Sequence, residues 1–326
     1  MIAVVAAACV RFTTFGTATG PIDTTSATAE AVATLVPAAG FWLITLPEGT
    51  VVLDCCETVP TTRPALTIAA VAAVCVKFTT FGTATGPGVA GWSLGEPVMG
   101  FIDPFQRAQG TFAEFVPVPA PFVSRRPASI DHRLGAALPC VGITAVTLCD
   151  LAHVGRDSRV LVNGASGGVG HLAVQVAKAR GARVTAVAST GRRDFVTSLG
   201  ADAFIDYRTT PATEWPGGFD AVLDCVPSLP RSTHARLLRR GGHYASTLPG
   251  AATYTIDPVL NRLGRLVRRA VMLQPNEPAM RELVRYVEQG SLRCEIAGEY
   301  ALKDTNRAIE ASRRGHVAGK LLIRVA

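Results

Sequence analysis

The sequence predicts an α/β protein built on a Rossmann-type doubly wound parallel sheet. A buried strand, a glycine turn and an amphipathic helix follow one another between Arg159 and Gly181. Further strand-like and helix-like segments then alternate, which is typical of a parallel sheet covered by helices. The length of 326 residues exceeds a usual single core and predicts two domains.

The segment from Arg159 to Gly181 has the pattern of a dinucleotide-binding unit. Val160–Val162 is a short apolar run that suits a strand buried on both faces. Apolar residues then recur at helical spacing, and Gly181 supplies a stop. The N–H groups and the positive dipole end of such a helix can hold a pyrophosphate. The predicted cofactor-binding turn consists of Ala165, Ser166, Gly167, Gly168, Val169 and Gly170.

The glycine pattern has an alanine, Ala165, at its first position, so the surrounding elements must support the interpretation. A glycine turn that binds nothing is the alternative. The later segments favour a nucleotide site, because a second strand comes at the spacing that a βαβ unit needs. The expected strands are Arg183–Ala188, Ala203–Tyr207, Ala221–Val226 and His243–Thr247, and a helix is expected across Arg231–Arg240.

From about Gly91 to its end, the sequence carries a series of motifs. They are Gly91–Gly100, Gly110–Pro119, Ala136–Ala145, Asn163–Gly170, Ser198–Asp202 with Ile205–Tyr207, Phe219–Asp224 and Gly315–Lys320. In these motifs and their order the chain resembles the medium-chain dehydrogenase/reductase superfamily, in its zinc-independent quinone oxidoreductase and enoyl reductase branch. Together the motifs are highly specific, although each alone is not.

This resemblance implies a domain organisation. Residues 1–120 are expected to form a GroES-like β-barrel catalytic domain, and residues 121–275 a dinucleotide-binding Rossmann domain. Residues 276–326 are expected to return to the catalytic domain. The elements expected in this return are a helix, Glu282–Gln289, and two strands, Glu299–Leu302 and Leu321–Val325. The resemblance also implies a homodimer.

Residues 1–90 match the family poorly. Ile2–Pro21 and Ile68–Pro87 are nearly the same peptide, and the second copy interrupts the family's sequence pattern. There is no third copy, which argues against a solenoid. We infer a local duplication, an engineered splice or a sequence error. Extended segments are still expected at Gly49–Asp54 and Leu66–Ile68.

Composition and charge argue against several classes of protein. The net charge of +7 comes mostly from scattered arginines without interleaved aromatic residues, so nucleic acid is not an expected partner. A long uncharged and apolar stretch, Ala31–Leu46, contains Pro37 and falls short of a membrane span, so no membrane is expected either. The eight cysteines include no C-x-x-C motif, and no signal peptide is recognised. These features predict a cytoplasmic location.

A catalytic zinc ion is not expected. Such a site needs three protein ligands, and the zinc-dependent branch of the family takes a histidine and a cysteine from the N-terminal domain. The first histidine of this chain is His132. The four-cysteine loop that holds a structural zinc is also absent. The sequence therefore predicts no metal and no reaction that uses zinc as a Lewis acid.

The end of the second strand favours NADPH as the cofactor. An NAD site usually presents an acidic residue there to bind the ribose 2′-hydroxyl. This chain has Ser189, Thr190 and Arg193, whose hydroxyl and guanidinium groups can donate to a 2′-phosphate. By resemblance, Ser189 and Arg193 align with phosphate contacts of the family, and Tyr207 lies near the same phosphate. Ordinary surface charges are the alternative for the arginines.

Four further residues are candidates for the nicotinamide end of the cofactor. The segment around Thr144 resembles the part of the family that lies alongside the reactive ring. Thr144 either hydrogen-bonds the cofactor or caps the start of a helix. Cys225, Ser246 and Thr247 follow strands at their carboxyl ends, where ligands bind in this architecture.

The predicted activity is hydride transfer from NADPH to a small-molecule quinone or α,β-unsaturated carbonyl substrate, an enone or enoyl compound. The cofactor carries the reactivity, while the protein sets distance and orientation. No catalytic residue is identified, because the proton can come from solvent. Lys320 either helps to close the cofactor cleft or is a solvated lysine, and His171 occupies the first helical turn. The alternative function, motivated by residues 1–90, is an NADPH-binding sensor or a catalytically inert relative.

Overall fold

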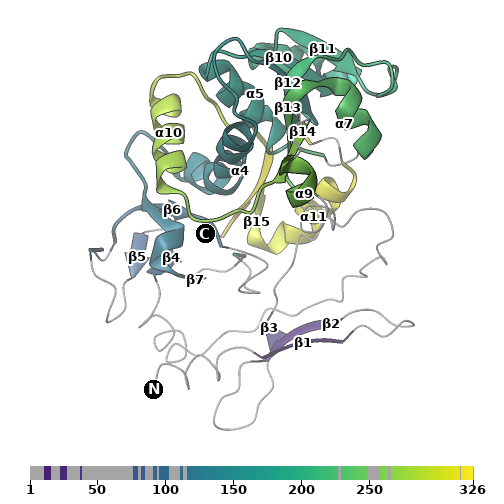
Figure 1. Cartoon of the computed structure of the whole chain (residues 1–326). Coiled ribbons are helices and arrows are strands. Elements are labelled where there is room, and N and C mark those ends of the chain that lie inside the picture. Colours follow the sequence, from purple (N-terminus) through teal and green to yellow (C-terminus); the bar gives the residue numbers. More distant parts are fainter. Residues whose placement is uncertain are drawn as a thin grey trace. The chain divides into compact units, whose positions relative to one another are not determined.

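The structure of the chain is a computed structural model (Figure 1). It describes residues 91–93, 95–102, 111–112, 116–226, 229–248, 257–262, 266–315 and 317–325, together with short strand segments before residue 85. The chain divides into two compact units. One is Arg126–Arg324, and the other is Met1–Arg125 with Val325–Ala326.

The unit Arg126–Arg324 is built on a six-stranded parallel sheet with the strand order β11-β10-β9-β12-β13-β14. Its strands are β9 (Arg159–Asn163), β10 (Arg183–Ala188), β11 (Ala203–Asp206), β12 (Phe219–Asp224), β13 (Leu238–Ser246) and β14 (Leu266–Ala270). The strand order reverses between β9 and β12, and ligands bind outside the carboxyl ends of the strands at such a switch point. The predicted α/β class with a doubly wound sheet is confirmed.

The centre of the sheet is buried on both faces. Val160, Leu161 and Val162 are fully buried, as their continuous apolar run predicts. β9 pairs with β10 on one side and with β12 on the other. Figure 1 shows α5 (Gly170–Ala179) and α7 (Arg231–Leu237) on opposite faces of the sheet. The glycine turn therefore follows a strand that is buried at the centre of the sheet.

α4 (His132–Leu151) is a 20-residue helix that precedes the sheet. Asp131 caps its start, accepting a hydrogen bond from the Leu134 backbone N–H at 2.7 Å. The alternative that Thr144 caps a helix start is wrong, because Thr144 lies inside α4. α4 is apolar and long enough to cross a membrane, but 67% of its apolar window is buried within the protein. It packs against α5 and α10 (Glu277–Glu288), as a core helix does.

One predicted helix is too long at its C-terminal end. The helix expected over Arg231–Arg240 ends at Leu237. Leu238 already belongs to β13, where it pairs with Phe219 of β12. The remaining short elements of the sheet region are η2 (Thr190–Arg192), α6 (Arg193–Ser198) and α9 (Asp257–Arg262).

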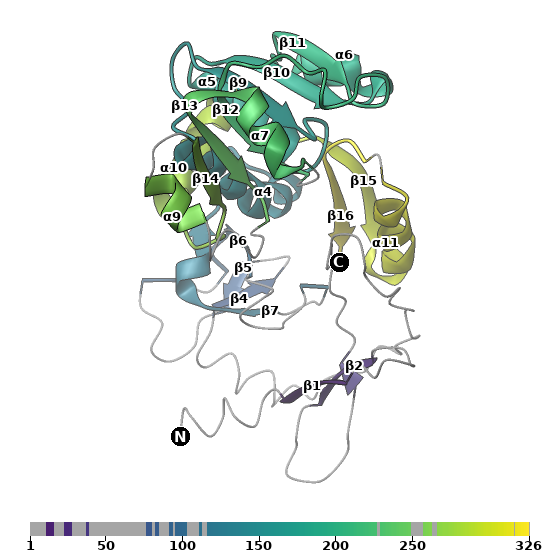
Figure 2. The same ribbon diagram turned by 45° about the vertical axis from the view of Figure 1, so that its right-hand side comes forward.

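The C-terminal elements of this unit form a small parallel pair of strands with a helix. β15 (Ile296–Ala301) pairs with β16 (Lys320–Arg324). η3 (Leu302–Asp304) and α11 (Thr305–Arg313) connect them, and Figure 2 shows α11 lying beside both strands. The predicted helix Glu282–Gln289 is confirmed as α10 (Glu277–Glu288), and the two predicted strands are confirmed as β15 and β16, with bounds shifted by a few residues. α11 was not predicted.

The unit that contains Met1–Arg125 is described only in part. Its strands are β1 (Arg11–Phe15), β2 (Asp23–Ala27), β3 (Pro37–Ala38), β4 (Val76–Thr79), β5 (Gly82–Ala84), β6 (Val98–Gly100), β7 (Val116–Val118) and β8 (Val123–Arg125), with η1 (Ala120–Phe122). β1 lies in the first copy of the repeated peptide, whereas the second copy forms the β4–β5 hairpin. The expected strands Gly49–Asp54 and Leu66–Ile68 lie outside the described residues, and the barrel and the domain boundaries stay predictions.

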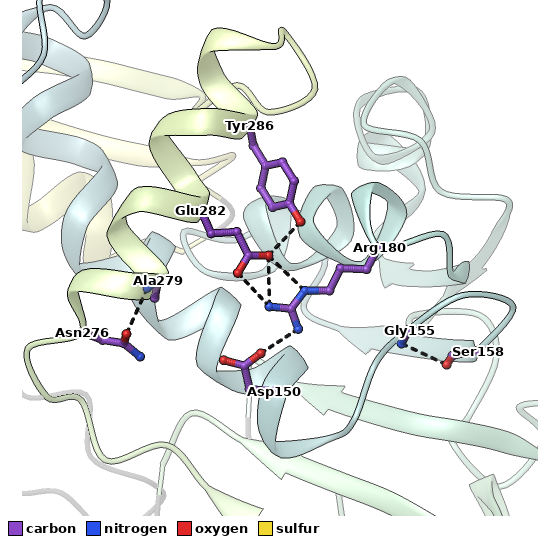
Figure 3. Close-up of polar contacts among 8 residues, drawn as sticks. All are labelled: Asp150, Gly155, Ser158, Arg180, Asn276, Ala279, Glu282 and Tyr286. Atoms are coloured by element: carbon purple, nitrogen blue, oxygen red, sulfur yellow. Dashed lines mark hydrogen bonds and ion pairs between the residues drawn. The ribbon is translucent and has the colours of Figure 1, made fainter.

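An arginine at the end of α5 joins the three helices on one face of the sheet (Figure 3). Arg180 Nη1 lies 2.8 Å from Asp150 Oδ1 of α4. Arg180 Nη2 donates to both carboxylate oxygens of Glu282 in α10 at 3.1 Å. Tyr286 donates its hydroxyl to the same carboxylate at 2.7 Å. The Arg180 side chain is 16% exposed, so in this cluster a largely buried guanidinium links the end of α5 to both α4 and α10.

We expect Arg180→Met to lower the free energy of unfolding by about 2 kcal/mol, because Glu282 keeps its charge without its partner. The matched control is Arg281→Met, which breaks the Arg281–Glu277 pair, whose side chains are 68% and 72% exposed. This exposed pair is worth at most about 0.5 kcal/mol. Urea unfolding of both variants measures the difference, and equal losses would show that the cluster does not fasten the helices.

Candidate cofactor site

The turn between β9 and α5 is closely packed around two glycines. Gly164 has a φ of +73°, which favours glycine. A Cβ atom on Gly170 would lie 2.1 Å from the carbonyl oxygen of Gly164 and 2.9 Å from Cα of Ala165. Only glycine therefore allows α5 to begin this close to the end of β9, which is the geometry of a dinucleotide-binding turn.

The predicted turn residues are brought together at the switch point of the sheet. Ala165 is fully buried, and its N–H donates to the Val187 carbonyl at 3.0 Å, so it anchors the turn to β10. Val169 is the N-cap of α5, and among the described residues no side chain caps this helix end. The start of a helix attracts an anion to backbone N–H groups that the helix does not pair. In α5 the His171 and Leu172 N–H groups already donate to the Gly167 and Val169 carbonyls at 3.1 Å, so the N–H groups before His171 are the ones that can hold the anion.

The C-terminal segment of the unit lies against this turn. The Gly319 N–H donates to the Ser166 carbonyl at 3.1 Å. A Cβ atom on Gly168 would lie 3.1 Å from Cδ of Lys320, so the lysine side chain crosses the turn at Gly168. Lys320 is half-buried rather than fully solvated. This position agrees with the expectation that Lys320 closes the cofactor cleft, which stays a prediction.

His171 has a structural role that the sequence did not reveal. The Glu295 N–H donates to Nε2 of His171 at 3.1 Å, so Nδ1 carries the proton and donates to the Gly167 carbonyl at 2.9 Å. Burial lowers the pKa of His171 to about 4. Gln175, one helical turn later, bonds to the backbone of Arg293 at 2.8 and 2.9 Å. The two side chains thus fasten the segment before β15 to the glycine turn and to α5.

A buried polar network lies at the ends of three adjacent strands. Asp224 is fully buried and accepts hydrogen bonds from Asn163 Nδ2 at 2.8 Å and from the Tyr244 hydroxyl at 2.6 Å. Burial raises the pKa of Asp224 to about 6, although these hydrogen bonds oppose the rise. The ring of Tyr244 stacks on His234 with a centroid distance of 3.7 Å. The network fixes the carboxyl ends of β9, β12 and β13 relative to one another.

The candidate 2′-phosphate residues lie together at the ends of β10 and β11. Ser189 directly follows β10, and the Tyr207 N–H donates to the Ala188 carbonyl at 3.3 Å. The guanidinium of Arg193 lies over the ring of Phe204, 4.6 Å from its centroid. Thr190 donates its hydroxyl to the carboxylate of Asp206. Sequence reasoning missed Asp206, although its place at the end of a predicted strand was a usable signal.

The candidates for the nicotinamide end lie on α4 and at the carboxyl ends of β12 and β13. Thr144 donates its hydroxyl to the Cys140 carbonyl at 2.7 Å, which leaves its oxygen as an acceptor only. The Cys225 N–H donates to the Asn163 carbonyl at 3.0 Å, and burial raises the pKa of its thiol well above the usual value. The Thr247 N–H donates to the Asp224 carbonyl at 3.1 Å, and Ser246 is buried beside it.

Among the residues that the structure describes, no group of three or more His, Cys, Asp or Glu side chains is placed to hold a metal ion. Residues 1–131, which contain no histidine, lie in large part outside these described residues. The expectation of a site without zinc therefore stays a prediction.

Comparison with known proteins identifies the family. A model of the zinc-binding dehydrogenase family matches residues 199–323. The chain is 31% identical over 251 residues to a chloroplast envelope quinone oxidoreductase homolog of Arabidopsis thaliana. This match covers 73% of this chain and 75% of that protein. The chain is also 30% identical over 266 residues to the mitochondrial NAD(P)H oxidoreductase RTN4IP1 of Homo sapiens. This match covers 71% of this chain and 65% of that protein.

Solved structures agree with this result. The structure of the quinone oxidoreductase from Coxiella burnetii matches with a TM-score of 0.68 and 27% identity, covering 75% of this chain and 77% of that chain. Relatives named for the chloroplast and the mitochondrion occur among the matches, so the cytoplasmic location stays a prediction, as does the homodimer. On its sequence relatives and its fold, the chain belongs to the medium-chain dehydrogenase/reductase superfamily.

Proposed function

We propose that this chain is an NADPH-dependent reductase that transfers hydride to a quinone or an α,β-unsaturated carbonyl compound without a metal ion. Its relatives named quinone oxidoreductase and NAD(P)H oxidoreductase make it an oxidoreductase that uses a nicotinamide cofactor. The observation that carries the proposal is the packing of Gly170 against Gly164, where a Cβ would come within 2.1 Å of backbone. This cradle lies where a parallel sheet of this strand order binds its ligand.

The residues present fit a dinucleotide. The uncapped start of α5 would hold the pyrophosphate through backbone N–H groups. Ser189 and Arg193 would hold the 2′-phosphate at the ends of β10 and β11. The edge formed by Cys225, Ser246 and Thr247 would lie beneath the nicotinamide ring, as expected for ligands at the carboxyl ends of parallel strands.

The charges at the end of β10 support NADPH over NADH. Asp206 is the acidic side chain found beside Thr190, but it is only 8% exposed. One of its oxygens accepts from the Thr190 hydroxyl, and the other accepts from the Arg208 N–H at 2.8 Å. The carboxylate is thus directed into the protein and does not present itself to a ribose 2′-hydroxyl. The exposed Arg193 remains as a cation for a phosphate.

The cofactor supplies a hydride when it is bound. The chain contributes orientation, because the glycine turn, the Asp224 network and the α4 face fix where a dinucleotide can lie. Tyr244 and His171 are not placed to donate a proton to substrate. The Tyr244 hydroxyl donates its hydrogen bond to Asp224, and both ring nitrogens of His171 are occupied by backbone groups. A proton from solvent completes the reduction of the substrate oxygen or carbon.

Turnover separates this function from its alternative. We expect NADPH oxidation, followed at 340 nm, to depend on an added quinone or enone from a panel of both classes. Binding of NADPH is measured in parallel by calorimetry. Binding without oxidation in the presence of any acceptor would instead support the alternative, a sensor or an inert relative.

We expect Arg193→Ala to weaken NADPH binding about tenfold or more and to leave NADH binding unchanged, because it removes a charge-assisted donor to the 2′-phosphate. Arg183→Ala is the matched control, since it removes the same charge from the other end of β10, where Arg183 faces Asp157 at 4.0 Å. Calorimetric titrations measure both variants. Equal losses in the two would indicate a general charge effect and contradict the assigned site.

A further inference from the structure

Thr190 and Asp206 form a contact that bears on which cofactor the site selects. Thr190 is exposed at the carboxyl end of β10, among the residues assigned to the 2′ position. Asp206 ends the neighbouring strand β11, and the two strands are in register at Ala188 and Asp206. The Thr190 hydroxyl donates to Oδ2 of Asp206, and the Arg208 N–H donates to Oδ1 at 2.8 Å.

The number of protons in this contact limits what Thr190 can do. A carboxylate only accepts hydrogen bonds, and a threonine hydroxyl has a single proton. Because that proton is directed to Asp206, the outward side of Thr190 Oγ1 offers lone pairs alone. Lone pairs can accept from a ribose 2′-hydroxyl, but they repel the acceptor oxygens of a 2′-phosphate. The negative charge of Asp206 lies behind the same position and adds to this repulsion.

We propose that Asp206 is a specificity-determining residue that limits the preference for NADPH by holding the Thr190 proton. Ser189 and Arg193 then serve as the phosphate donors of the site, and Thr190 does not. This inference rests on the proposed function, because it concerns the 2′ position of the same cofactor.

Asp206→Asn reverses the role of Thr190 with little change in shape. The Arg208 N–H requires an acceptor, so the amide oxygen of the new side chain takes the place of Oδ1. The amide nitrogen then lies beside Thr190 and donates to its Oγ1. The Thr190 proton is released toward the cofactor, where it can donate to a 2′-phosphate. The variant also removes one negative charge from behind the phosphate.

The experiment is a double-mutant cycle with Asp206→Asn and Thr190→Val, read by calorimetric titration with NADP⁺ and with NAD⁺. We expect Asp206→Asn to raise the ratio of NADP⁺ to NAD⁺ affinity about tenfold. Thr190→Val alone does not lower that ratio, since its hydroxyl donates nothing to the phosphate, and the loss of its repelling lone pairs acts only to raise the ratio. In the double variant, the part of the rise in the NADP⁺ to NAD⁺ affinity ratio that comes from the released Thr190 hydroxyl is lost. Thermal unfolding of each variant shows that it is folded.

Two results would overturn the inference. One is an unchanged ratio in folded Asp206→Asn. The other is a selective loss of NADP⁺ affinity, of about tenfold, in Thr190→Val alone. Thr190 is exposed, so this variant is expected to fold, and it tests the inference even if the Asp206 variant does not fold. A wild-type protein that binds neither dinucleotide would overturn the proposed function and this inference together. Wild-type binding with either of the two results above overturns only the inference.

Discussion

Gly170→Ala is expected to lower the free energy of unfolding by more than about 3 kcal/mol and to remove cofactor binding. The new Cβ would lie 2.1 Å from the oxygen and 2.8 Å from the carbonyl carbon of Gly164. These atoms belong to backbone, so no side-chain rotation can relieve the overlap. α5 must move away from β9, and the N–H groups that would hold a pyrophosphate move with it.

Urea unfolding and NADPH titration of this variant test the prediction, with Gly167→Ala as the matched control. A Cβ on Gly167 would lie 3.4 Å from the same Gly164 oxygen, which is an ordinary contact. The control should therefore lose less than about 1 kcal/mol of stability. If Gly170→Ala were as stable as the control and still bound NADPH, the close packing of this turn would not be needed for the site.

The second large effect is a pH-dependent one at Asp224. Burial raises its pKa to about 6 from the usual 3.8, so the folded protein keeps this proton to a higher pH than the unfolded chain does. Well below pH 4, near pH 3, both states are protonated, and the group costs almost nothing. As the pH rises from 3 to 7, the unfolded state ionises first, and the folded state loses about 3 kcal/mol of stability, most of it between pH 4 and pH 6.

Asp224→Asn removes this titration. We expect the stability of the variant minus that of wild type to rise by about 3 kcal/mol between pH 3 and pH 7, and then to level off. Burial also lowers the pKa of His171 and of His234 to about 4, so these two histidines make the folded state more stable as the pH rises through the same interval. Their contribution is the same in the variant and in wild type, and it cancels in the difference. Urea unfolding at several pH values measures the difference. A difference that stays constant would contradict an Asp224 with a raised pKa.

Local patterns predicted the elements that depend on local chemistry. The apolar run at Val160–Val162 and the glycines before α5 identify a strand, a turn and a helix, and the parallel strands follow at the expected spacing. The helix over Arg231–Arg240 is too long because Leu238 and its neighbours pair with β12. That pairing joins residues far apart in the sequence, and helix periodicity alone does not reveal it.

The parts of the site that sequence reasoning missed are contacts between distant segments. His171 bonds to Glu295, more than a hundred residues away in the chain. Asn163 reaches Asp224 from a neighbouring strand, and Thr190 reaches Asp206 in the same way. His171 stands at the start of the predicted helix, and Asn163, Asp224, Thr190 and Asp206 stand at or near the ends of predicted strands. Their positions were therefore predictable, whereas their partners depend on the strand order of the sheet.

We propose that the turn before α5 binds a nicotinamide dinucleotide that carries a 2′-phosphate. Calorimetric titration of the full chain with NADPH and with NADH measures this binding. We expect saturable binding of one NADPH per chain, at least about tenfold tighter than NADH. No uptake of either dinucleotide by folded protein, or tighter binding of NADH, would contradict the claim.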